Sequence, residues 1–274
     1  MNSESTRYFS RPALRRNRRT HGFTLVETLV VLTVIAVVIA IGVPAVSRVL
    51  QTSHVRNAQG VAFVAKSAVT HFLSKPNSPG TLPVTEGTAA VLVSQYTGTG
   101  TPTAAAVAAA ATLDNVLLSE LFLERPLTVR MGVQNAATSG SANGFTWSPV
   151  TQTFTGTAAP TLSYAAMTRL ECAISDGTNN PGVTGQTAGS AACAFNLAGT
   201  GTLTPAGSRV AYLLIKNAPA AEAYQLSLDV NGPALTQNTT AAPATVDQTQ
   251  GAVAYAKDST GTGFVDVFYY VTNL

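Results

Sequence analysis

The chain has 274 residues, of which 46% are hydrophobic and only 11% are charged. This length allows one membrane anchor with one globular domain, or with two small ones. Its three histidines are His21, His54 and His71, so the remaining two hundred or so residues hold none, which excludes histidine-dependent catalysis and histidine-ligated metal sites there.

The net charge of +3 comes from the first 22 residues, which carry six arginines and one glutamate. Beyond them, 10 basic residues stand against 12 acidic ones, so this larger part has a net charge near −2. The charge therefore gives no indication of a nucleic-acid surface. No phosphate-binding glycine loop and no dinucleotide fingerprint occurs in the sequence, so we expect no cofactor.

An apolar run from Phe23 to Val46 contains a single charged residue, Glu27. Eighteen or more apolar residues are enough to span a bilayer as a helix. The arginines at positions 15–19 precede this run and are expected to stay cytoplasmic, so the rest of the chain is exported. A carboxylate inside such a helix is costly and usually serves a partner. Gly42 and Pro44 predict a kink or local melting near residues 40–44.

The start of the apolar run resembles the prepilin cleavage signature of type IV pilins and type II secretion pseudopilins. Gly22 precedes Phe23, Glu27 is the fifth residue after that glycine, and Pro44 is the twenty-second. The resemblance implies that a peptidase cuts after Gly22 and methylates Phe23, and that Phe23, Glu27 and Pro44 serve assembly. It covers about the first quarter of the chain. The alternative is an uncleaved signal anchor that contains a glutamate by chance.

The resemblance implies a structural filament subunit and not an enzyme. Its partners would be a prepilin peptidase/N-methyltransferase, other copies and minor pilins, and an inner-membrane assembly platform with a separate ATPase. The chain would cross the inner membrane once, with its head in the periplasm, before entering a periplasmic or extracellular filament. A surface pilus and a secretion or DNA-uptake pseudopilus both remain open. The alternative from a different class is a membrane-anchored binding or adhesion module that does not polymerise.

The expected domains are a basic leader (1–22), a long helix (23–75) and an exported head (76–274). The helix divides into a membrane half (23–46) and an amphipathic half (47–75), whose apolar residues recur every three or four positions up to Phe72. In the head, alanine-rich residues 103–124 predict a second helix, and 89–96 allow a short one. Period-two runs predict strands at Leu127–Val133, Phe145–Phe154, Arg209–Lys216, Tyr224–Val230, Ala252–Lys257 and Phe264–Thr272. The last two strands should form one hairpin, and Arg209–Lys216 with Tyr224–Val230 another. The fold class is therefore α+β: a long helix packed on a mostly antiparallel sheet, which is also the architecture of pilins.

Cys172 and Cys193 enclose a loop rich in glycine. In an exported domain we expect them to form a disulfide that contributes roughly 3 kcal/mol. Their spacing does not suit a redox pair. Asp176, Asn179 and Asn180 could supply oxygen ligands to calcium, but their Asp-Gly and Asn-Pro pairs favour ordinary turns, so no metal site is assigned. His54 and His71 are expected to be packing or solvated residues.

Overall fold

The structure is a computed structural model of the whole chain. It describes residues 25–75, 80–85, 112–125, 127–131, 145–148, 153–156, 168–185, 193–237 and 245–274. The chain divides into two units, Met1–Ser47 and Arg48–Leu274. Helix α1 (Leu25–Ser74) contributes residues to both units, and each unit is described by itself below.

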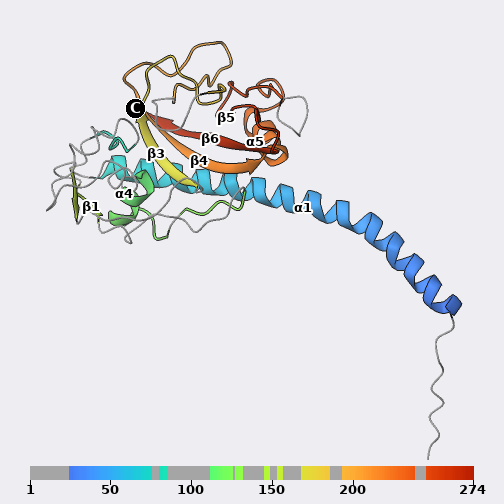
Figure 1. The fold of residues 1–274 in the computed structure, drawn as a ribbon. Helices are drawn as coiled ribbons and strands as arrows, with labels where there is room; N and C mark the ends of the chain where they lie inside the picture. Colours follow the sequence, from blue (N-terminus) through green and yellow to red (C-terminus); the bar gives the residue numbers. More distant parts are fainter. Residues whose placement is uncertain are drawn as a thin grey trace, which may run out of the picture. The chain divides into compact units, whose positions relative to one another are not determined.

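In the second unit, α1 buries one stripe of its surface. Val55, Ala58, Ala62, Ala65 and Val69 are all buried, and the stripe ends at Phe72. The spacing of three or four residues is that of one face of a helix, as the sequence predicted. Most of the buried side chains are small, so the helix backbone can lie close to the sheet beneath it. Figure 1 shows the sheet alongside this half of α1.

The sheet has four strands in the order β3-β4-β6-β5, and every neighbouring pair is antiparallel. The strands are β3 (Arg169–Ile174), β4 (Arg209–Pro219), β5 (Val253–Tyr255) and β6 (Phe264–Asn273). The α+β class, with a long apolar helix and an antiparallel sheet, is therefore confirmed as a pilin-like architecture. The predicted hairpin of the last two strands is confirmed too, with Ala254 opposite Phe268.

Alternation along the strands creates two cores, because successive side chains point to opposite faces of a sheet. On β4, Ala211, Leu213 and Ile215 join the core shared with α1. Tyr212 and Leu214 join a smaller core on the other face, which Phe195 and Cys193 help to form. A shift of one residue in register would exchange these two sets of side chains, so both faces fix the register.

Both edges of the sheet are covered by loop segments. Thr85 bonds the outer edge of β3, because its backbone N–H donates to the Cys172 carbonyl at 2.8 Å and its Oγ1 accepts from the Cys172 N–H at 2.9 Å. On the opposite edge, Gln248 exchanges two backbone hydrogen bonds with Tyr255 of β5, at 2.8 and 3.1 Å. Edge strands left open invite pairing with other chains.

Among the described residues, two further helices belong to the second unit, and both differ from the sequence prediction. Of the helix expected over 103–124, residues 103–111 lie outside the described residues, and α4 covers Leu113–Ser119. The chain turns at Leu121, which has a left-handed φ of 62°. Helix α5 (Ala220–Asn231) occupies the stretch predicted as the strand Tyr224–Val230, so the predicted hairpin with Arg209–Lys216 is wrong.

The failure at α5 has a local cause. Pro219 precedes the run Ala220-Ala221-Glu222-Ala223, and alanine and glutamate are strong helix formers. The buried residues Ala220, Ala223, Leu226 and Ser227 then recur at helical spacing. The apparent alternation from Tyr224 to Val230 was therefore a coincidence of a short window.

Two further strand predictions need correction, and one strand was missed. Leu127–Met131 alternates buried and exposed residues but belongs to no strand. The run Phe145–Phe154 is two strands, β1 (Phe145–Ser148) and β2 (Thr153–Gly156), paired as a separate two-stranded sheet. Strand β3 was not predicted from the sequence. The short helix proposed at 89–96 lies outside the described residues.

Candidate functional site

The N-terminal part of α1 exposes nearly all of its apolar side chains. From Leu25 to Val43 the large hydrophobic residues are between 48% and 79% exposed. Among the described residues, α1 is the one helix long and apolar enough to cross a membrane, with a mean hydropathy of 3.0 over its best window, none of which is buried. A soluble domain does not leave such a surface open, so another apolar environment must cover it.

The few polar groups in this stretch are adapted to an apolar environment. Thr28 and Thr33 each donate a hydroxyl hydrogen bond to the carbonyl three residues earlier, at 2.9 and 2.8 Å. Such local bonds satisfy a hydroxyl without water. Glu27 lies in the first turn of α1, where the helix dipole favours a negative charge.

Of the four residues assigned to processing and assembly, Glu27 and Pro44 fall within α1. Gly22 and Phe23 lie outside the described residues. The helix runs without interruption through residues 40–44, so the local melting that Gly42 and Pro44 predicted does not occur. The assignment of these four residues to processing and assembly stays a prediction.

Three side-chain contacts hold the second half of α1 to the rest of its unit. His54 Nδ1 lies 2.8 Å from Glu222 Oε1 at the start of α5. Asn57 Oδ1 accepts from the Arg130 backbone N–H at 2.8 Å. At the end of α1, Lys75 Nζ lies 2.7 Å from Glu120 Oε2. The His54–Glu222 pair could not be predicted from the sequence, because the two residues are 168 positions apart.

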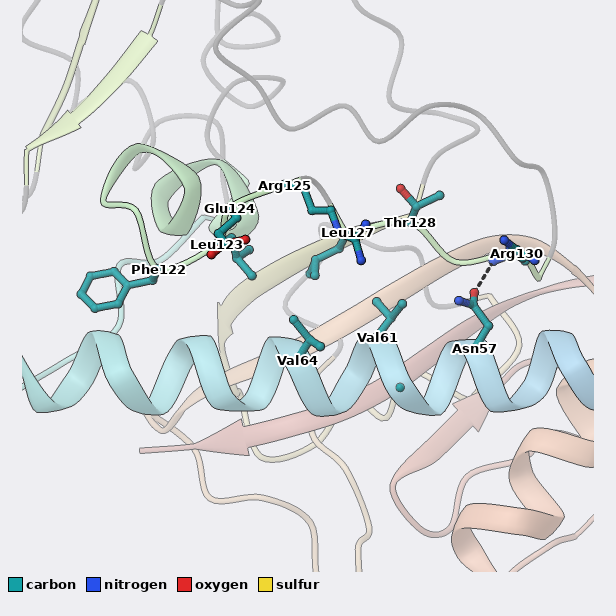
Figure 2. A pocket seen from close by; sticks show the side chains of 11 residues that line it. Asn57, Val61, Val64, Phe122, Leu123, Glu124, Arg125, Leu127, Thr128 and Arg130 are labelled. Carbon is teal, nitrogen blue, oxygen red and sulfur yellow. Dashed lines mark hydrogen bonds between the residues drawn. The ribbon is translucent and has the colours of Figure 1, made fainter.

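The Asn57 contact closes one end of a groove between α1 and the segment 122–130 (Figure 2). The groove has a volume of about 740 Å³. Val61 and Val64 point into it from α1, and Leu127 faces them from the opposite wall. Its rim carries charges of both signs, Glu124 and Arg125.

Cys172 and Cys193 are both buried. Burial raises the pKa of the Cys172 thiol, and a charge on Cys193 would raise it further, so the two side chains are electrostatic neighbours. They belong to different cores, with Cys172 on the α1 side of the sheet and Cys193 on the other. The disulfide stays a prediction.

The residues considered for calcium are engaged in turns. Asp176 accepts hydrogen bonds from the backbone N–H groups of Thr178 and Asn179, both at 2.8 Å, and from the Asn179 amide. Although desolvation acts to raise the pKa of Asp176, these bonds lower it overall. Another aspartate, Asp258, accepts from the Gly263 and Gly261 N–H groups. Its pKa falls to about 2, first because of the Gly263 bond and then because of the bonds from Thr260. The described residues hold no cluster of three or more metal-ligating side chains.

One family model matches a short part of the chain near its N-terminus. Residues 17–43 match the prokaryotic N-terminal methylation motif, which is the prepilin motif of type IV pilins and pseudopilins. The match includes Gly22, Phe23 and Glu27 and ends one residue before Pro44. It points to a protein of the prepilin-processed type and to a structural protein, not an enzyme. No curated protein and no solved structure matches the chain.

Proposed function

We propose that this chain, which carries the methylation motif of prepilins, is a structural subunit of a type IV pilus-like or type II secretion-type filament. The proposal rests on one observation: the motif continues directly into the exposed apolar part of α1. The matched residues 17–43 run into a helix whose apolar side chains are exposed from Leu25 to Val43. A membrane can cover this surface before assembly, and the same helices of other copies can cover it afterwards.

The first step is processing at Gly22. A prepilin peptidase hydrolyses the peptide bond between Gly22 and Phe23, which leaves a cationic amine on Phe23 that the same enzyme methylates. Glu27, four residues further on, is then the counter-charge for the amine of a neighbouring subunit. Opposite charges attract strongly at low dielectric, whereas an unpaired carboxylate there is heavily penalised. This difference sets the axial register of one subunit against the next.

Assembly then follows from where the apolar surface lies. The apolar helices of successive copies bundle together, and the heads, built on residues 48–274, cover them. Minor pilins, an inner-membrane platform and a separate ATPase are the further partners. The head faces the periplasm before assembly and forms the outer surface of a periplasmic or extracellular filament afterwards.

The processing step is tested with Gly22→Ala in the native host. Mass spectrometry of the N-terminus should find Phe23 as the first residue in the wild type and uncut protein in the variant. Gly42→Ala is the matched control, because a Cβ at position 42 of α1 meets no atom within 4 Å. Normal trimming of the Gly22 variant would contradict the peptidase step.

The assembly step is tested with Glu27→Ala. The variant should insert and be cut normally, but it should not enter filaments sheared from the cells. Thr33→Val is the control, since it also removes a polar group from the exposed stretch but one that bonds only its own helix. Unchanged filament yield would remove Glu27 from its proposed part. A wild-type chain that is processed yet never found in polymers would indicate an anchored surface module instead.

A further inference from the structure

Helix α4 carries a carboxyl group in an apolar environment. Asp114 is 0% exposed, and so are Leu113, Val116 and Leu117 around it. Neither carboxyl oxygen has a well-formed hydrogen bond. The Thr112 hydroxyl and the Leu170 backbone lie near the carboxyl and offset part of the effect of burial. A buried charge without a partner is expensive, so such a group favours its neutral form.

The nearby charges do not neutralise it. Arg169 on β3 acts on Asp114, but only as the weakest of the influences on its pKa. The Arg169 guanidinium is engaged with Glu171, with Nε 2.6 Å from Oε1. Glu171 also accepts from the Thr85 hydroxyl at 2.8 Å. On the α1 side, Lys75 is paired with Glu120 of the turn after α4.

We propose that ionisation of Asp114 loosens the docking of α4 against β3 and the end of α1, so that this part of the head opens more readily at neutral than at acidic pH. The turn that follows α4 packs on the end of α1, where Phe122 meets Phe72 edge-on at 5.6 Å between ring centroids. Opening would uncover this end of the core without unfolding the sheet. Local openings of this kind occur below the free energy of global unfolding.

The direction of the pH effect on docking follows from the two protonation states of Asp114. Burial raises the pKa of Asp114 from 3.8 to about 6 in the docked state. Between these values the docked helix keeps a proton that the opened helix loses, so docking weakens as pH rises through this window. Above the docked-state pKa of about 6, Asp114 is ionised in both the docked and the opened helix, so the docking strength no longer changes with pH. Linkage gives an increase in opening of about tenfold from pH 5 to pH 8.

Hydrogen exchange of the full chain in detergent, read by mass spectrometry on peptides of residues 112–125, tests this. After correction for intrinsic exchange, opening of α4 should rise about tenfold from pH 5 to pH 8, while peptides of β4 show no such rise. Asp114→Asn should abolish the rise and protect α4 about a hundredfold better at pH 7.5. Asp229→Asn, at an exposed position of α5, should behave as the wild type.

Equal pH dependence in the wild type and Asp114→Asn would overturn the proposal. So would an α4 that opens no more at pH 8 than at pH 5. If the asparagine variant does not fold, the wild type alone decides, by the difference between its α4 and β4 peptides across pH. A pH dependence shared by the α4 and β4 peptides would then reflect global unfolding and would refute a local opening of α4.

Discussion

The side-chain amide of Asn231 should be one of the most sensitive polar groups in the head. Asn231 is the last residue of α5, and its Nδ2 lies 2.9–3.1 Å from three acceptors, Ser227 Oγ and the Gln250 and Val253 carbonyls, which share its two N–H donors. Its Oδ1 accepts from the Val253 N–H at 3.0 Å. Asn231→Ala removes these bonds. The backbone N–H and C=O of the buried Val253 then lose their Asn231 partners. At about 0.5–1.5 kcal/mol for each net hydrogen bond, the free energy of unfolding should fall by about 3 kcal/mol.

Gly251 offers an independent way to disturb the same amide. A Cβ at this position, where φ is +88°, would lie 2.2 Å from Asn231 Cγ. Gly251→Ala should therefore displace the amide as well as strain the backbone. Part of the destabilisation by Gly251→Ala comes from displacing the Asn231 amide. Gly251→Ala should therefore lower the free energy of unfolding by less in a protein that already carries Asn231→Ala. A double-mutant cycle should give a coupling of about 1 kcal/mol or more.

Urea unfolding of the full chain in detergent, followed by circular dichroism, measures both effects. Gln51→Ala, at an exposed position of α1, is the control and should change stability by less than about 0.5 kcal/mol. The slope with denaturant should stay constant, so that the midpoint reports stability. An Asn231→Ala variant as stable as this control would refute the reasoning, and so would strictly additive costs in the cycle.

Three further predictions concern single features of the head. Leu121→Gly should stabilise the protein by about 1 kcal/mol in thermal unfolding, because it relieves a left-handed φ of 62°, whereas Leu121→Ala, which keeps the strain, should not. Phe72→Ala should cost about 3–5 kcal/mol, since it empties a buried site and removes the contact with Phe122; a loss below 1 kcal/mol would mean that the site collapses. After denaturation without reductant, Cys172 and Cys193 should not react with a thiol label, and two labelled cysteines would reject the disulfide.

The sequence predicted the parts of the fold that depend on long, regular patterns. The apolar run and the stripe from Val55 to Phe72 place α1 to within a residue or so at its end. The long alternations at 209–216 and 264–272 became β4 and β6, whose side chains divide between two cores. Each of these patterns persists over eight residues or more, so chance seldom produces them.

Short patterns were less informative, because tertiary contacts decide them. Residues 127–131 have the alternation of a strand, but no strand pairs with them among the described residues. β3 was missed because its buried run includes Glu171, whose contacts with Arg169 and Thr85 form only on folding. The same limit applies to the site: the glycine, phenylalanine and glutamate of the motif could be recognised, but His54–Glu222 and Asp114 depend on residues brought together by folding.

The bonded residues at the sheet edges bear on how this part of the chain tolerates crowding. Thr85 occupies the backbone N–H and C=O of Cys172 on the outer side of β3, and Gln248 occupies those of Tyr255 on β5. At these two positions a second copy of the chain finds no open backbone group with which to extend the four-stranded sheet. A ladder between two copies would be interrupted there, which disfavours edge-to-edge joining of these sheets.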